Sequence, residues 1–113
     1  TKGLQGIKGI TTPYVDPRVK HVWHQYVVRI EPEFPMSRDG LADYLRDKGI
    51  GTAVHYPIPI HHQPLYKKLG YPQDDCFNAI EASKRVLSLP VHPQLSDEDI
   101  SYIIEAVREA GKQ

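Results

Sequence analysis

The chain has 113 residues, with 14 basic and 14 acidic side chains and one cysteine, Cys76, which suits a single domain with a modest core and no internal disulfide. A balanced charge gives no long-range field to attract nucleic acid, and no apolar run approaches the roughly 20 residues that span a bilayer. We therefore expect a cytoplasmic protein, kept in a reducing compartment, that binds neither nucleic acid nor membrane.

The first third of the chain contains one clear strand pattern. Residues 1–20 show neither helical periodicity nor alternation, so they are interpreted as a leading tail or as a connection within a longer protein. Residues 21–31 alternate between two faces and are rich in β-branched and aromatic side chains, which predicts the longest strand of the chain. Pro32 and Pro35 remove two backbone donors and end it.

A helix is predicted over residues 37–49. Ser37 can cap its first turn, and Gly49 suits a left-handed stop. Leu41 and Leu45, with Tyr44 beside them, recur at helical spacing and form the stripe expected to be buried. The charged side chains of the segment are expected in solvent: Arg38, Asp39, Asp43, Arg46 and Asp47.

The middle of the chain predicts a strand and a short helix. β-Branched residues favour a strand over residues 51–56, which Pro57 closes. A helix of two turns at most is predicted over residues 63–70, since Pro64 suits its first turn and Gly70 its end.

The last third predicts two further helices with a strand between them. Residues 77–87 carry a weak helical pattern that passes into a short extended segment over residues 87–91. A final helix runs from Ser96 to Gly111, and Asp99 lies where a capping box needs an acid. Its apolar stripe consists of Ile100, Ile103, Ile104 and Val107.

Together these elements predict a small α+β domain. The sheet has about three strands, mostly antiparallel, and helices pack on one of its faces. No internal repeat or second domain boundary is visible.

The stretch "GIGTAVHYPIPIHHQPLY", residues 49–66, is the candidate site, because it contains His55, His61 and His62 on a backbone stiffened by three prolines. Three interpretations remain open: a metal site, histidines that only pack in a loop, and a loop that binds a ligand. The spacing disfavours metal, because adjacent histidines diverge and no CxxC or HExxH supplies further ligands.

A nucleophilic or nucleotide-binding motif is absent from the sequence. Cys76 follows Asp75, whose charge opposes thiolate formation. There is no GxSxG, P-loop or GxGxxG. The residues alone therefore indicate a binding surface and no complete active site.

Three segments taken together carry a family resemblance: "HVWHQYVVRI", "LADYLRDKGIGTAVHYPIPIHHQPLYKKLGY" and "VLSLPVHPQLSDEDISYIIEAV". In this order they resemble the C-terminal domain of the DegT/DnrJ/EryC1/StrS family of sugar aminotransferases. The opening "LQGIKGITTPYVDP" is similar to the family segment that leads from the large domain into the small one. The resemblance thus implies a connecting segment over residues 1–20 and a small domain over residues 21–113.

The resemblance implies a parent enzyme that uses pyridoxal 5'-phosphate to move an amino group from an amino acid, usually glutamate, onto a nucleotide-linked keto-sugar. The family's Schiff-base lysine belongs to the large domain, and no lysine here stands in a similar motif. The fragment is therefore expected to bind no cofactor and to be inactive alone. The parent is expected to be a homodimer.

In similar enzymes the "HYP-x-P-x-H" loop approaches the active site, so the resemblance makes His55, Tyr56 and His61 the candidate substrate-binding residues. His61 is the better candidate for the donor carboxylate or the sugar, whereas His55 is also a candidate for holding the loop in place. His62 lies off the motif and is expected at the surface. The alternative is a free-standing module of the same fold that binds a small anion or a protein, and a start codon near Thr1 would favour it.

Overall fold

The computed structural model describes residues 1–113. Along the chain its elements are β1 (Ile10–Thr11), β2 (Tyr26–Ile30), α1 (Arg38–Asp47), the 3-10 turn η1 (Ile60–His62), α2 (Pro64–Lys68), α3 (Phe77–Arg85), β3 (Val86–Leu89) and α4 (Asp97–Ala110). The strands form one antiparallel sheet in the order β1-β2-β3. This confirms the predicted α+β class. None of the helices is both long and apolar enough to cross a bilayer.

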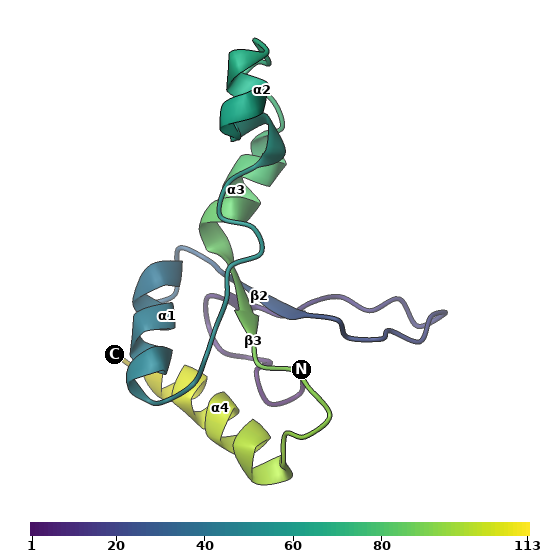
Figure 1. Ribbon diagram of the computed structural model, residues 1–113. Helices are drawn as coiled ribbons and strands as arrows, with labels where there is room; N and C mark the ends of the chain where they lie inside the picture. Colours follow the sequence, from purple (N-terminus) through teal and green to yellow (C-terminus); the bar gives the residue numbers. More distant parts are fainter.

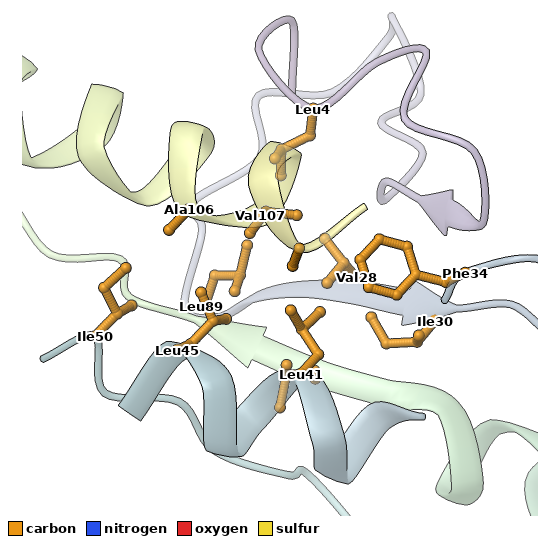
Figure 2. Close-up of a cluster of buried hydrophobic side chains, with 12 residues drawn as sticks. Leu4, Val28, Ile30, Phe34, Leu41, Leu45, Ile50, Leu89, Ala106 and Val107 are labelled. Atoms are coloured by element: carbon orange, nitrogen blue, oxygen red, sulfur yellow. The ribbon is translucent and has the colours of Figure 1, made fainter. Parts of the chain in front are cut away.

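The core lies between one face of the sheet and two helices (Figure 2). Side chains alternate along a strand, so Val28 and Leu87, which are register partners, point to the same face. Helix α1 covers this face with Leu41, and α4 covers it with Val107. The other buried apolar residues that join them are Leu4, Ile30, Phe34, Leu45, Ile50, Leu89, Ala106 and Ala110.

The predicted ends of the two core helices are confirmed. The Ser37 hydroxyl accepts the Gly40 N–H at the start of α1, and Gly49, just after α1, has a φ of 76°. At the start of α4, the Ser96 hydroxyl accepts the Asp99 N–H, and the Asp99 carboxylate accepts the Ser96 N–H. Each cap satisfies first-turn donors that no helical carbonyl reaches.

The predicted stripe of α4 is only partly buried. Val107 is fully buried, and Ile103 and Ile104 pack against the core from its margin. Ile100, by contrast, is 43% exposed. Ile100 instead borders a pocket that Leu89, Pro90 and Leu95 also line at this end of the sheet.

The strand predicted over residues 21–31 is shorter in the structure, because β2 begins only at Tyr26. Trp23 has a φ of 48°, outside the extended region, and the His21 Nδ1 accepts the Trp23 N–H. The chain therefore turns just before the strand. The ladder partners set its length, since β3 pairs with residues 26–29 and β1 with residues 29–30.

The strand predicted over residues 51–56 is wrong, because only Ala53 forms a bridge, with Ser88 of β3. The outer edge of β3 explains this. The Val86 N–H already donates to Ala82, the Val86 carbonyl accepts from Arg38, and Pro90 has no N–H. Ser88 is thus the one residue whose N–H and carbonyl are both free to pair at this edge.

The connecting segment contains structure that its sequence did not predict. Leu4 lies in the core, and β1 pairs with the far end of β2. The Glu31 N–H donates to the Gly9 carbonyl and holds this segment against the sheet. Residues 1–11 therefore pack as part of the body, by which we mean the sheet, α1, α4 and the segment that precedes β2 up to residue 11.

Residues 56–77, which we call the arm, project from this body with η1 and α2 near their outer end (Figure 1). The radius of gyration is 15.7 Å, against about 13 Å for a compact chain of this length. Large apolar side chains of the arm are 46–73% exposed: Tyr56, Ile58, Ile60, Leu65, Leu69, Tyr71 and Phe77. Such a patch is unusual for a surface that faces only water.

Arg38 secures the junction between α3 and β3. Its guanidinium donates to the carbonyls of Ser83 and Val86 at 3.2 and 3.3 Å. The side chain is only 11% exposed, so the prediction that it lies in solvent is wrong. The carbonyls at the end of α3 lack helical partners, and a cation with several donors can satisfy them.

Candidate functional site

The predicted site residues lie in two different surroundings. His55 and Tyr56 follow the bridge at Ala53, next to β3, and their rings meet edge to face with centroids 5.6 Å apart. Tyr56 is 73% exposed. His61 belongs to η1 in the arm, where its ring lies 4.3 Å from that of His62. The peptide bond between His55 and Tyr56 is cis.

Ser88 orients the imidazole of His55. The His55 Nδ1 and the Ser88 Oγ are 3.0 Å apart, and Ser88 is only 7% exposed. The hydroxyl has no other partner, so donating to Nδ1 satisfies both groups. We assign the remaining proton of the neutral ring to Nε2 on this basis. Nε2 has no partner in the chain and is not among the enclosed polar atoms, so it is open to a ligand.

A shallow pocket of about 280 Å³, broadly open to solvent, lies beside this pair. Three stretches border it: the residues before β2, the bridge segment and the end of β3. Its polar side chains are His24, Gln25, Thr52, His55 and Ser88. All of them can donate a hydrogen bond, and no acidic, lysine or arginine side chain lines the pocket.

His61 is less accessible than its motif position suggests. Its Nε2 is enclosed and has no hydrogen-bond partner, and the same holds for the Gln73 Oε1. The Gln73 amide donates to the carbonyls of His61 and Tyr71 at 2.9 and 2.8 Å. A ligand therefore reaches this nitrogen only if the chain around it moves.

His62 is half-buried, and its Nε2 donates to the Gln73 carbonyl. It remains partly exposed at the surface, and its ring is also held within the arm. The contact joins η1 to the segment before α3 and gives His62 a structural role within the arm. The chain holds no cluster of three or more histidine, cysteine or acidic side chains placed to bind a metal.

Sequence reasoning missed Ser88, His24 and Gln25. Ser88 carries one usable signal: it is a polar residue between two buried leucines, at the position that alternation turns away from the core. His24 and Gln25 carry none, because they reach the pocket only through the turn that shortens β2.

Comparison with known proteins gives consistent matches. Residues 1–108 match the model of the DegT/DnrJ/EryC1/StrS aminotransferase family. The chain is 42% identical over 112 residues to the spore coat polysaccharide biosynthesis protein SpsC of Bacillus subtilis. It is 38% identical over 107 residues to the dTDP-3-amino-3,4,6-trideoxy-alpha-D-glucose transaminase of Streptomyces venezuelae.

The fold is also that of a solved relative, DesV of S. venezuelae, with a TM-score of 0.88 and 37% identity. The match covers 99% of this chain and 29% of that one. Against SpsC it covers 96% of this chain and 28% of SpsC, and against the transaminase 95% and 27%. The chain thus spans between a quarter and a third of these relatives, and it belongs to the DegT/DnrJ/EryC1/StrS aminotransferase family.

Proposed function

We propose that the chain is the C-terminal small domain of a sugar aminotransferase that uses pyridoxal 5'-phosphate. The parent enzyme transfers an amino group from an amino acid, glutamate, to a nucleotide-linked keto-sugar. The observation that carries this proposal is the family match over residues 1–108, together with a relative 38% identical that is named as a dTDP-sugar transaminase. The division into a connecting segment, residues 1–20, and a small domain, residues 21–113, follows the same resemblance.

The cofactor, when bound in the parent, would supply the chemistry that moves the amino group from the amino acid to the keto-sugar. The residues of this chain fit a supporting role, because its pocket beside β3 is lined by residues that can form hydrogen bonds and by no lysine. Lys67 and Lys68 lie on the exposed helix α2, and Lys84 pairs with Glu81 on the surface of α3. The isolated chain is therefore inactive.

His55, Tyr56 and His61 are the proposed substrate-binding residues of this domain. His55 presents an open Nε2, and Tyr56 presents an exposed ring beside it. Both groups suit binding and orienting a polar substrate. His61 contributes only after a rearrangement of the arm, since its Nε2 is enclosed in the arrangement seen here.

The parent enzyme is proposed to be a cytoplasmic homodimer. The exposed apolar side chains of the arm support a protein partner for this surface, because removing apolar surface from water is favourable. That partner is the remainder of the enzyme, in the same or the second subunit.

A substrate panel tests the proposal. The full-length protein, loaded with pyridoxal 5'-phosphate, is incubated with glutamate and each of several dTDP- and UDP-linked keto-sugars. Formation of 2-oxoglutarate and of an amino sugar with at least one of them is the expected result. The 113-residue chain under the same conditions is the control and is expected to form neither. A full-length protein that consumes no keto-sugar of the panel contradicts the proposal.

A further inference from the structure

The turn before β2 holds Trp23 in a backbone conformation that its side chain disfavours. Its φ of 48° lies in the left-handed region, where the Cβ crowds the following carbonyl oxygen. Cys76 is the one other residue besides glycine with a positive φ. A disfavoured conformation of this kind persists only where the surrounding contacts stabilise it. The contacts of Trp23 therefore decide whether the turn forms.

Two neighbouring side chains provide these contacts. The Trp23 N–H donates to the His21 Nδ1 at 2.9 Å, and the centroids of the two rings are 4.2 Å apart. The Trp23 ring also lies 5.3 Å from that of Tyr26, the first residue of β2. A side chain that accepts the N–H two residues further along is the arrangement by which Asn and Asp form turns. In this chain the acceptor is an imidazole, which can be protonated.

We propose that His21 is a pH-sensitive switch for this turn: the neutral imidazole holds Trp23 in place, and the imidazolium releases it. An acceptor at Nδ1 needs its lone pair, so we assign the proton of the neutral ring to Nε2. Protonation adds a hydrogen to Nδ1, and two donors then face each other where one hydrogen bond had been. Histidine changes its charge between about pH 5 and 8, and the switch operates within this range.

No carboxylate is in contact with His21 to hold an imidazolium in place. The titratable or charged groups beside the turn are Lys20, which precedes His21, His24 within the turn, and Tyr26 with the adjoining Thr1. Asp16 is the nearest acidic residue along the chain, and it pairs with Arg18. Protonation of His21 therefore removes one hydrogen bond and creates no ion pair in exchange.

The turn also determines what borders the shallow pocket beside β3. His24 and Gln25 line this pocket, and the ladder of β2 with β3 begins only after them, at the pair Tyr26 and Leu89. Neither residue belongs to the ladder, so their position depends on the turn. Acid is thus expected to withdraw both side chains from the pocket, and a return to neutral pH to restore them. This inference concerns the surface of the chain and does not rest on the proposed function.

Fluorescence of the 113-residue chain tests the switch, because Trp23 is its one tryptophan. The chain is titrated from about pH 8 to about pH 5, the range in which histidine changes its charge. We expect the emission maximum to move to longer wavelength in acid, since the indole leaves the ring of His21 and meets more water. Far-UV circular dichroism should stay unchanged through this transition. A loss of dichroism in step with the fluorescence would show unfolding of the whole chain and overturn the proposal.

Substitutions of the two histidines separate the switch from other effects of acid. His21→Asn keeps a side-chain oxygen that accepts the Trp23 N–H and does not titrate, so it should abolish the transition. His21→Ala removes the acceptor and should show in neutral solution the emission that the wild type reaches in acid. His24→Asn makes the same change within the same turn and should leave the transition in place. A transition that persists in His21→Asn, one that disappears in His24→Asn, or a wild type without a transition overturns the proposal.

Nuclear magnetic resonance tests the effect on the pocket. The measurement uses His24→Asn, so that the charge of His24 does not contribute. The side-chain amide of Gln25 should move together with the indole N–H of Trp23 as the pH falls, and it should stay fixed once His21→Asn is added. The backbone amide of Val28, which lies inside the ladder, should stay fixed in both proteins. A Gln25 amide that does not follow the transition at Trp23 would overturn the part of the proposal that concerns the pocket.

Discussion

Gly9 lies where the connecting segment crosses the turn after β2. Its φ is 78°, and a Cβ built on it would come within 2.3 Å of the Phe34 backbone nitrogen. Gly6 has a similar φ of 80°, but a Cβ there would meet nothing within 4 Å. The two glycines share the backbone conformation and differ in the space around them.

This pair allows the steric contribution to be measured by itself. Gly6→Ala places a side chain in the left-handed region and is expected to lower the free energy of unfolding by about 1–2 kcal/mol. Gly9→Ala must also displace the Phe34 backbone, which adds about 1–3 kcal/mol. Urea unfolding of the 113-residue chain gives both values. Equal losses would show that Phe34 moves aside freely.

At the scale of the element, the capping box of α4 joins Ser96 and Asp99 by reciprocal hydrogen bonds. Ser96→Ala removes the hydroxyl that accepts the Asp99 N–H and is expected to lower the free energy of unfolding by about 1 kcal/mol. Ser101→Ala is the matched control, because the Ser101 hydroxyl only bonds back to the Asp97 carbonyl on the exposed side of the same helix. That change should be nearly neutral. Thermal unfolding followed by circular dichroism compares them.

The same cap makes stability depend on pH. The hydrogen bond from the Ser96 N–H lowers the pKa of Asp99 from its ordinary value of 3.8. A lowered folded pKa stabilises the fold above the unfolded pKa, and this contribution is lost as the pH falls through the folded pKa. We therefore expect the free energy of unfolding of the wild type to exceed that of Asp99→Asn by a constant margin above about pH 5. This margin should shrink below pH 3.8. Urea midpoints across this range give the margin, and a margin that grows in acid would contradict the assignment.

The contrast between helices and strands shows what the sequence could predict. The cap of α1 depends on residues within one turn, Ser37 and Gly40, so local pattern was sufficient. The strand over residues 51–56 failed because its pairing was decided by backbone groups of Val86 and Pro90, more than 30 residues away. Arg38 was misplaced for the same reason, since its partners are carbonyls of α3 and β3.

The candidate site divides in the same way. The loop motif located His55 and Tyr56, but their partners come from other elements. Ser88 and His24 become part of the site only through the pairing of β3 and the turn before β2. A motif identifies residues on one segment of the chain. Which histidine nitrogens a ligand can reach depends on how several segments pack together.

At the scale of the whole molecule, the body and the arm differ in what holds them. The body has a continuous apolar core, whereas the arm exposes most of its large apolar side chains (Figure 1). Leu65 and Leu69 on the arm are 61% and 62% exposed, and Leu41 in the body is fully buried. Leucine side chains should therefore contribute to association in the arm and to folding in the body.

The double substitution Leu65→Gln with Leu69→Gln is expected to change the free energy of unfolding of the 113-residue chain by no more than about 0.5 kcal/mol. It should reduce self-association, because less apolar surface meets water. Leu41→Ala, the control, should cost about 2–5 kcal/mol. Urea unfolding and light scattering measure the two properties, and a large loss of stability in the arm variant would show that the arm packs more firmly than described.

The pairing of β3 has a consequence for what the pocket can recognise. Side chains alternate, so a slip of the strand by one residue would turn Ser88 into the core and bring Leu87 or Leu89 to the side of His55. The imidazole would then face a methyl group in place of a hydroxyl, and nothing would choose between its two nitrogens. The register of a four-residue strand thus determines which proton the loop offers, so that ligand specificity depends on an accurate fold at this position.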